Sequence, residues 1–322
     1  MVASRPLRRV AAFLIRFMPW GILTLAGLGI VAAPLGLQCS FIERLTHMRF
    51  YWLAALVVLL VWWAVRKAVV PAILSCALLA AGLPMVWRYY RSGSAPMDAG
   101  KSRATLTVAS WNVHSSNPER ERGAVWLKHC PADVMLLTEV NPGWAKHLKE
   151  ITSRWPHQIC EPRNGAAGIW LLSRWPLTQV EAAGISPNED RPWIACTVET
   201  PQGNVMVMGM HPRTPRGGHR FHERNAQLDH AAHFAAAATG PVVVLGDLNC
   251  TPFSPWFDRL LERGRLRDSA MGRGLTPTWQ SGIWLLPIDH ILIGGPLTVV
   301  DRQVHGDNLG SDHSPVIATL RF

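Results

Sequence analysis

Polar side chains that can bind metal ions or transfer protons stand directly after apolar runs at several places in this sequence. In GDLNC, Asp247 and Asn249 follow the apolar run at residues 242–245. Residues two apart in extended backbone point to the same side, so this spacing places a carboxylate and an amide together. Gly, Asp and Asn are also the usual turn residues, and a simple turn is the alternative interpretation. The rest of the chain decides between a turn and a catalytic carboxylate at the mouth of a sheet.

The same arrangement recurs through the C-terminal two thirds of the chain, where further apolar runs end on a polar side chain. These polar residues are Asn112 in SWNV, Glu139 in LLTEV, His211 in GMH, Asp289 in PIDHI, and Asp312 and His313 in GSDHSPV. Taken singly, each is more simply explained as a turn residue or a hydrogen-bonded polar group. Together they indicate one site at the ends of strands, where functional residues are usually held on sheet scaffolds.

The elements that must position these residues alternate between short β-rich runs and helical stretches. The predicted strands cover residues 106–113, 134–138, 168–173, 193–200, 204–210, 242–245, 288–293, 297–304 and 314–320. The predicted helices cover residues 119–129, 142–151, 219–238 and 256–263. Many strands with a few covering helices predict two packed sheets with helices outside, which is an α/β sandwich.

The net charge of +10 is concentrated in the first hundred residues. Residues 1–100 carry 10 Lys or Arg and 2 Asp or Glu, which gives +8, whereas residues 101–322 carry 22 and 20, which gives +2. A strongly basic nucleic-acid binder would carry the excess on its folded domain. Because the first hundred residues are also strongly apolar, their charge is typical of membrane-flanking segments.

Three apolar stretches, at residues 17–37, 50–65 and 68–87, predict transmembrane helices near the length of about 20 residues that a span needs. Trp and Tyr residues near their ends suit the interfacial belts of a bilayer. A buried helical bundle is the less favoured alternative. The predicted organisation is a transmembrane region of three helices over residues 1–90, a small polar linker over residues 91–103 and an α/β domain over residues 104–322.

Basic residues around the apolar stretches bear on the side of the membrane that holds the domain. With three spans, the basic cluster before the first stretch and the Arg66-Lys67 pair between the second and third both face the cytoplasm. The domain then lies on the outer face, periplasmic or extracellular. The basic residues after the third stretch favour the opposite orientation, and loss of the short second span would leave the domain in the cytoplasm.

Taken in order, SWNV, LLTEV, GMH, GDLN, PIDHI and GSDHSPV resemble the endonuclease/exonuclease/phosphatase superfamily over residues 104–322. That family includes pancreatic deoxyribonuclease, abasic-site endonucleases, inositol polyphosphate 5-phosphatases and neutral sphingomyelinases. The resemblance implies a four-layered α/β sandwich of two β-sheets flanked by helices, with the site at one edge. It also implies a metal-dependent phosphoester hydrolase, whose substrate is a phospholipid headgroup, a nucleic acid or a soluble phosphate ester.

Hydrolysis of an anionic phosphodiester requires charge neutralisation and an activated water. The resemblance assigns Glu139, Asn112 and Asp312 to the region that holds a divalent cation. Carboxylate and amide oxygens suit Mg²⁺, and hard oxygen sites of this kind accept Mn²⁺ as well. The residue two after Asn112 is an acidic ligand in abasic-site endonucleases but is His114 here, which puts a direct ligand at this position in doubt. His114 either binds phosphate or packs against a neighbour, and packing is the preferred interpretation.

The resemblance also implies the catalytic roles. Asp247 is expected to orient and deprotonate the attacking water, with Asn249 positioning that water or a phosphate oxygen. His313 and His211 are expected to contact the scissile phosphate, as proton donor or as stabilising cation. Asp289 would bond the other ring nitrogen of His313 and fix its tautomer.

Several alternatives stay open. By strand alternation, His290 should face away from the site. The basic run at residues 211–224 either grips substrate phosphates or is a solvated loop leading into a helix. A nuclease acting on DNA or RNA is an alternative function, and so is a catalytically silent binding module of the same fold. The presence of both Asp247 and His313 disfavours the silent module.

Overall fold

The computed structural model of the chain describes residues 5–91, 105–183 and 191–322. The chain divides into two units. A helical unit comprises Met1–Arg88 with Phe253–Pro255, and an α/β unit comprises Tyr89–Pro252 with Trp256–Phe322. The linker predicted over residues 91–103 lies outside the described residues except for Arg91.

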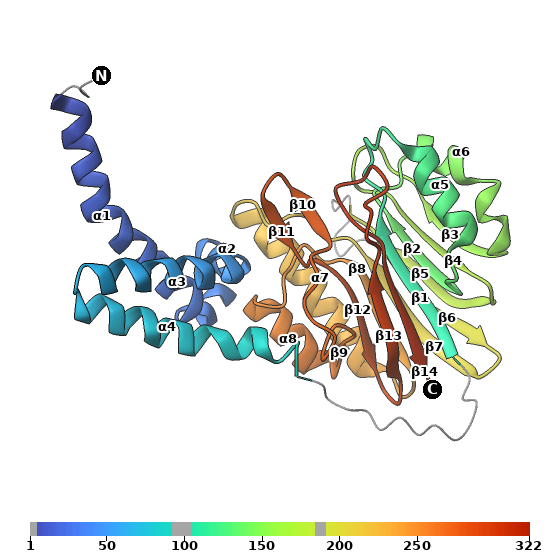
Figure 1. The fold of residues 1–322 in the computed structure, drawn as a ribbon. Coiled ribbons are helices and arrows are strands. Elements are labelled where there is room, and N and C mark those ends of the chain that lie inside the picture. Colours follow the sequence, from blue (N-terminus) through green and yellow to red (C-terminus); the bar gives the residue numbers. More distant parts are fainter. Residues whose placement is uncertain (1–4, 92–104, 184–190) are drawn as a thin grey trace. The chain divides into compact units, whose positions relative to one another are not determined.

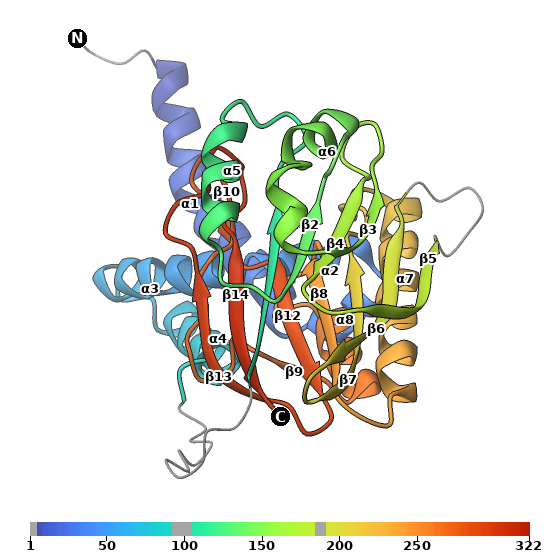
Figure 2. The same cartoon turned by 90° about the vertical axis from the view of Figure 1, so that its right-hand side faces the viewer.

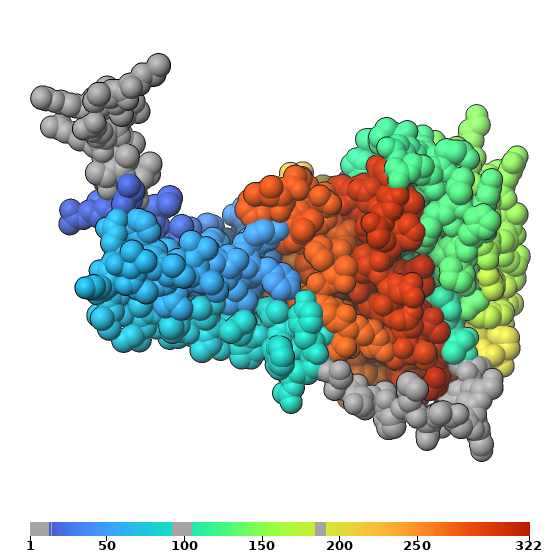
Figure 3. Space-filling view, viewed as in Figure 1, coloured from blue at the N-terminus to red at the C-terminus, as the bar shows by residue number. Residues whose placement is uncertain are grey.

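The helical unit contains four α-helices and one short 3-10 helix among its described residues (Figure 1). Its elements are α1 (Arg5–Ile30), the 3-10 helix η1 (Ala33–Leu37), α2 (Ser40–His47), α3 (Arg49–Val65) and α4 (Val69–Trp87). Small and aliphatic side chains of α1 and α3, among them Ala26 and Leu56, form its buried interior. The α3 and α4 helices pack side by side, as the space-filling view also shows (Figure 3).

The outward faces of α3 and α4 are apolar. Val58 is 69% exposed, Val65 77% and Val70 67%. An exposed apolar surface of this kind indicates contact with another protein or with a membrane. Within the described residues, α4 is the one helix long and apolar enough to cross a membrane, and α2 and α3 together pass the same test as one span bent by 70°.

By length and composition, one described helix, or two spans if the bent pair counts as one, could cross a membrane, and the three spans expected from the sequence stay a prediction. The predicted stretch at residues 17–37 is interrupted, because α1 ends at Ile30 and η1 begins at Ala33 with a proline at its start. Residues 15–30 of α1 form an apolar helix that is shorter than the roughly 20 residues a span needs.

Two six-stranded mixed sheets form the α/β unit. The first has the order β13-β14-β1-β2-β4-β3, with β13 (Thr298–Val304), β14 (Val316–Arg321), β1 (Thr105–Asn112), β2 (Val134–Thr138), β4 (Ile169–Ser173) and β3 (His157–Glu161). The second has the order β5-β6-β7-β8-β12-β9, with β5 (Leu177–Ala183), β6 (Trp193–Thr200), β7 (Gly203–Met210), β8 (Val242–Asp247), β12 (Asp289–Gly294) and β9 (Arg267–Asp268). A separate hairpin comprises β10 (Trp279–Ser281) and β11 (Trp284–Leu286).

Apolar side chains from both sheets fill the space between them. Val108 and Leu136 of the first sheet and Val207, Leu245 and Ile291 of the second are fully buried in this cluster. The outer side of the first sheet is covered by α5 (Arg120–His129) and α6 (Pro142–Leu148), and that of the second by α7 (Gly218–Ala237) and α8 (Pro255–Gly264) (Figure 2). The predicted sandwich of two sheets flanked by helices is confirmed.

Five strands of the structure are missing from the sequence prediction, namely β3, β5 and the short strands β9, β10 and β11. Both β3 and β5 are edge strands. The residues of β3, HQICE, alternate between half-buried and exposed, and β5 is exposed over most of its length. Because an edge strand of this kind buries little side-chain area, its sequence contains no apolar run to indicate it.

Candidate active site

The ends of β1, β7 and β8 and the start of β12 carry the predicted polar residues to one edge of the α/β unit. Asp247 and Asp289 are direct cross-strand partners, because β8 and β12 pair antiparallel in that register. Asn112 at the end of β1 donates a hydrogen bond from Nδ2 to Asp247 Oδ2 at 3.1 Å, which joins the first sheet to the second. Strand register and this bond therefore bring together residues more than a hundred positions apart.

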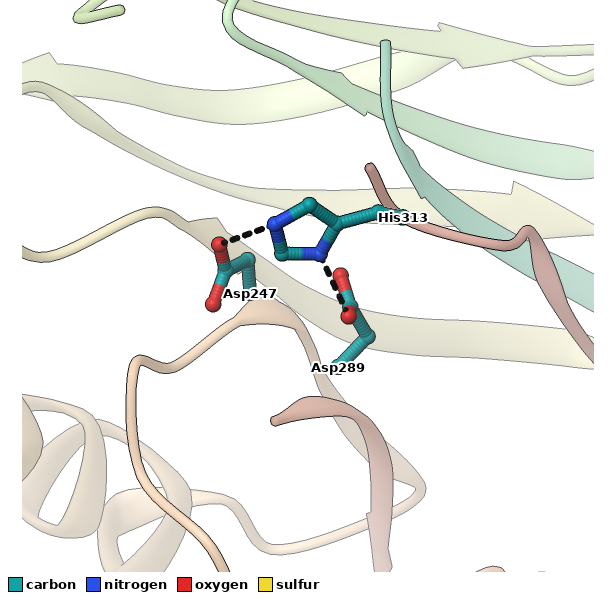
Figure 4. A group of neighbouring side chains, drawn as sticks. All are labelled: Asp247, Asp289 and His313. Atoms are coloured by element: carbon teal, nitrogen blue, oxygen red, sulfur yellow. Dashed lines mark hydrogen bonds and ion pairs between the residues drawn. The ribbon is translucent and has the colours of Figure 1, made fainter. Parts of the chain in front are cut away.

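His313 lies between two carboxylates (Figure 4). Its Nδ1 is 2.8 Å from Asp289 Oδ2, and its Nε2 is 3.6 Å from Asp247 Oδ2. Thr278 Oγ1 donates to the same Asp289 oxygen at 2.6 Å. The loop that carries His313 is tied to β1, since Ser311 Oγ donates to the Asn112 carbonyl at 2.8 Å and accepts from His313 N at 3.0 Å. The imidazole is thus held in one orientation.

Burial and charge set the protonation of this cluster. Burial alone would lower the pKa of His313, but the Asp289 and Asp247 charges outweigh burial and raise it to about 10. Burial alone would raise the pKa of Asp247, but the His313 charge and the His211 hydrogen bond outweigh it and lower the pKa below its ordinary value. At neutral pH the site therefore holds an imidazolium beside an ionised Asp247 carboxylate.

His211 reaches Asp247 from the end of β7. Its Nε2 lies 3.3 Å from Asp247 Oδ2, and its Nδ1 lies 3.1 Å from Nη1 of Arg191. The strands approach closely here, because Gly246 has φ of 141° and a Cβ on it would lie 1.9 Å from the Met210 carbonyl oxygen. Glycine at 246 is what lets His211 and Asp247 meet.

Asn249 holds the loop after β8. Its backbone N–H donates to Asp247 Oδ1 at 2.9 Å, and its Nδ2 donates to the Pro212 carbonyl at 3.0 Å. Arg224, buried on α7, donates to the Asn249 carbonyl at 3.3 Å. With φ of 47°, Asn249 adopts the left-handed conformation that Asn tolerates better than most residues. The Asp247–Asn249 segment is therefore both a turn and part of the site.

Glu139 and Asp312 lie beside this cluster. Glu139 accepts from Asn112 Nδ2 at 3.2 Å and from Ser115 N at 3.1 Å. Asp312 Oδ2 accepts from Trp279 Nε1 at 3.0 Å, while its Oδ1 is buried and accepts no hydrogen bond from any described residue. Asp312 Oδ1 lies 3.2 Å from His114 Nδ1 and 4.0 Å from His313 Nε2, which places this carboxylate at the same edge of the α/β unit as Asp247.

His114 lies between the two carboxylates, which corrects the expectation that it packs against a neighbour. Its Nδ1 is 3.2 Å from Asp312 Oδ1 and 3.8 Å from Glu139 Oε2. The physical reason is local: His114 N donates to Asn112 Oδ1 at 3.0 Å, and φ of 56° at His114 turns the chain back toward the site. This bond also engages the amide oxygen that the sequence suggested as a ligand.

All eight predicted residues thus lie at one edge, joined directly or through one neighbour. His290 faces away as expected, with its Nε2 2.8 Å from the Cys250 carbonyl. Sequence reasoning missed Arg191, Thr278 and Trp279, whose roles arise from contacts distant in sequence. The ligand atoms of Asp247, Asp289 and His313 lie within 4.8 Å of one another, a spacing that a metal ion also accepts. The hydrogen bonds and opposite charges of these three residues already explain why they lie so close together, with no metal ion between them.

Residues 109–313 match the Endonuclease/Exonuclease/phosphatase family. The chain belongs to this family. It is a metal-dependent phosphoesterase or nuclease-like hydrolase with a buried Asp/His cluster. Comparison with curated proteins gives no match.

Several solved structures share the fold. An endonuclease/exonuclease/phosphatase from Beutenbergia cavernae DSM 12333 is 22% identical, covers 68% of this chain and 72% of its own length, and has a TM-score of 0.53. The 3'-5' exonuclease NExo from Neisseria meningitidis is 20% identical over 67% of this chain and 100% of its own, with a TM-score of 0.57. D. rerio TDP2 complexed with single-strand DNA product is 17% identical over 68% and 100%, with a TM-score of 0.57. At these identities the likeness establishes the fold alone.

Proposed function

We propose that this chain is a membrane-anchored phosphodiesterase that uses a divalent cation and a water activated by Asp247. The observation that carries the proposal is the position of Asp247 Oδ2, which Asn112 Nδ2, His211 Nε2 and His313 Nε2 surround at 3.1, 3.3 and 3.6 Å. A carboxylate held by several donors from separate strands is fixed in direction before substrate arrives. Such preorganisation is what a catalytic base requires.

Asp247 orients the attacking water and accepts its proton. Its Oδ1 accepts the backbone N–H of Asn249 within the loop, whereas Oδ2 lies among the side chains of Asn112, His211 and His313, and we assign the reaction to that side of the carboxylate. The lowered pKa of Asp247 keeps it ionised, and therefore able to accept a hydrogen bond from water, throughout the neutral range. Asn249 fixes the direction of this carboxylate and, through its backbone, the position of the loop.

His313 stabilises the negative charge that develops on the phosphate. Its raised pKa keeps it protonated, and its Nε2 faces the space beside Asp247 while Nδ1 is held by Asp289. A protonated imidazole with one nitrogen fixed donates from the other in a defined direction. Asp289 is thereby a positioning residue, and His313 is the proton donor to the leaving oxygen.

Glu139 and Asp312 would hold the divalent cation. The fit rests on Asp312 Oδ1, a buried oxygen that receives no hydrogen bond from the described part of the chain; His114 Nδ1 lies between it and Glu139 Oε2, at 3.2 and 3.8 Å. When bound, Mg²⁺ or Mn²⁺ would neutralise phosphate charge and polarise the phosphorus–oxygen bond. Asn112 links Glu139 to Asp247 through Nδ2, which keeps the metal region and the base at a constant separation.

Charge in the basic run favours a compact phosphate substrate over a long polyanion. Arg213 and His219 lie 3.7 and 3.3 Å from Glu223 Oε2, and Arg224 is buried against the Asn249 carbonyl. Two of the four arginines of the run are therefore directed at groups of the protein itself, whereas Arg216 and Arg220 are exposed. We infer that a phospholipid headgroup or soluble phosphodiester is the preferred substrate. A nuclease is the second candidate, since structures of relatives contain DNA products.

The apolar surface of α4 supports membrane anchoring. We infer that α4 crosses the bilayer with Arg66-Lys67 on the cytoplasmic side, which puts the α/β unit on the outer face. A phosphatase or fluorescent reporter fused to the C-terminus tests the side directly. Activity of the phosphatase reporter supports the outer face, whereas fluorescence with an inactive phosphatase places the unit in the cytoplasm.

Turnover by the full-length protein in detergent tests the chemistry. The substrates are sphingomyelin vesicles, inositol phosphates and plasmid DNA, each with Mg²⁺, Mn²⁺ or a chelator. We expect metal-dependent release of product that falls by about 10²–10⁴-fold in Asp247→Asn, because the amide cannot accept the proton. Asp301→Asn, an exposed carboxylate on β13, is the matched control and should keep full activity. Equal turnover by Asp247→Asn would remove the assignment of the base.

A further inference from the structure

We propose that Arg191 is a positioning residue that holds His211 in the tautomer with its proton on Nε2. His211 would then present a fixed N–H to the space beside Asp247. The consequence for turnover rests on the proposed function, whereas the tautomer itself does not. Neither Arg191 nor its contact is apparent from the sequence, because the residue precedes β6 and the histidine follows β7.

The contact between the two side chains has one chemical interpretation. Arg191 Nη1 lies 3.1 Å from His211 Nδ1. A guanidinium carries only N–H donors and has no lone pair to offer. The imidazole nitrogen facing it must therefore accept the hydrogen bond, which leaves Nδ1 without a proton.

The other ring nitrogen has the opposite partner. His211 Nε2 lies 3.3 Å from Asp247 Oδ2, and a carboxylate oxygen accepts hydrogen bonds. The proton of the ring is therefore on Nε2, directed at Asp247. Two independent contacts, one from a cation and one from an anion, specify the same tautomer.

Arg191 is itself held in place. Its backbone carbonyl accepts a hydrogen bond from Nε2 of Gln227, a buried residue of α7, at 3.0 Å. Its Nη1 also donates to the Ala166 carbonyl in the loop before β4. Two residues later, Trp193 stacks on His230 of α7 with ring centroids 4.5 Å apart. The Ala166 carbonyl thus holds the guanidinium, and Gln227 holds the backbone of Arg191.

The two histidines beside Asp247 are therefore set up in opposite ways. Nδ1 of His313 faces the carboxylate of Asp289, whereas Nδ1 of His211 faces the guanidinium of Arg191. A carboxylate favours a protonated nitrogen, and a guanidinium favours a bare one. Environments that differ in this way divide the roles of chemically identical side chains. His313 transfers the proton, and His211 aligns the base or the phosphate by donating a hydrogen bond without releasing its proton.

Nitrogen NMR of the full-length protein in detergent, labelled with ¹⁵N-histidine, tests the tautomer. The His211 signals are assigned by their loss in His211→Gln. At neutral pH we expect an unprotonated, hydrogen-bonded Nδ1 and a protonated Nε2. A protonated Nδ1 in the wild type would overturn the proposal, whatever the activity of the protein.

Substitutions at Arg191 test whether this residue sets the tautomer. Arg191→Met removes the donor, and the His211 ring signals should shift toward a mixture of tautomers. Arg191→Lys restores a donor without a lone pair and should restore the wild-type pattern, which guards against a Met variant that merely misfolds. Arg122→Met, at an exposed arginine, is the control and should leave the pattern unchanged. Wild-type signals in a folded Arg191→Met variant would contradict the proposal.

Turnover on the best substrate adds a separate readout. We expect Arg191→Met to lower kcat about tenfold with KM unchanged, less than the ~10²–10³ lost when a catalytic donor is removed outright. Arg191→Lys should recover most of the rate. A rise in KM alone with an unaltered tautomer would make Arg191 a substrate contact and overturn the proposal. If the wild type turns over no phosphoester, the proposed function fails, while the NMR result still decides the tautomer.

Discussion

Four separate segments of the chain contact the carboxylate of Asp247. Oδ1 accepts a hydrogen bond from the backbone of its own loop and Oδ2 accepts one from Asn112 at the end of β1, while His211 after β7 and His313 before β14 lie at ion-pair distance from Oδ2. Burial of a lone carboxylate would be strongly unfavourable, so the surrounding donors are what make its position tolerable. The same groups also fix the direction in which the Asp247 carboxylate points.

At the scale of single residues, the pH dependence of stability follows from the Asp289–His313 contact. Because the pKa of folded His313 is raised to about 10, its stabilising contribution is complete below the ordinary histidine value. We expect that contribution to disappear as the pH rises toward 10. Melting temperatures of the chelator-treated protein should therefore fall over this range.

Asp289→Asn isolates this effect from the titration of tyrosines and lysines in the same range. The amide removes one of the two charges that raise the pKa of His313, so the alkaline decline in melting temperature should become smaller and end at lower pH. Parallel curves for the two proteins would contradict the assigned protonation of His313.

At the scale of elements, the ends of β7 and β8 are brought together by a residue without a side chain. Gly246 sits at φ of 141°, where a Cβ would meet the Met210 carbonyl at 1.9 Å. His211 and Asp247 follow these two positions directly. The close approach of the ends of β7 and β8 therefore determines the distance between His211 and Asp247.

Gly246→Ala should destabilise the protein by about 1–3 kcal/mol from backbone strain, with a further loss from the clash. Gly240→Ala is the matched control, because it lies in the preceding turn with open space around its Cβ position. Thermal unfolding measures both variants. A Gly246→Ala protein as stable as Gly240→Ala would show that the strands separate without penalty.

The sequence predicts the central strands and the positions of the site residues because apolar runs of β2 or β8 end abruptly on a polar residue. It does not predict β3 and β5, whose exposed edges contain no such run. It also does not predict the partners of the site. Arg191 meets His211 across a strand pair, and His114 reaches Asp312 through a turn, so both contacts depend on tertiary geometry that spacing does not encode.

At the scale of the whole molecule, the helical unit and the α/β unit have different chemical characters. The first hundred residues carry +8 of the net charge and expose valines along α3 and α4, whereas residues 101–322 carry +2. A soluble core helix would bury the apolar surface that α4 exposes. This difference is the basis of the proposed membrane anchor.

Ala77→Arg tests the anchor, because Ala77 lies near the middle of α4 and is exposed. A charge at the centre of a spanning helix costs about 2.5–3.5 kcal/mol in insertion experiments. We expect the variant to be released from membranes by alkaline carbonate while the wild type and Ala77→Leu stay in the pellet. Equal extraction of all three proteins would argue against a spanning α4.

Three residues at the site, His114, Glu139 and Asn249, have φ of 56°, 62° and 47°. Left-handed backbone costs a residue with a side chain roughly 1–2 kcal/mol relative to glycine. Glu139→Gly should accordingly relax the backbone but also remove the hydrogen bonds that the carboxylate accepts from Asn112 and Ser115, and it should abolish turnover. These three positions therefore carry backbone strain that glycine would avoid. Strain of this kind is expected where the side chain is needed for function rather than for folding.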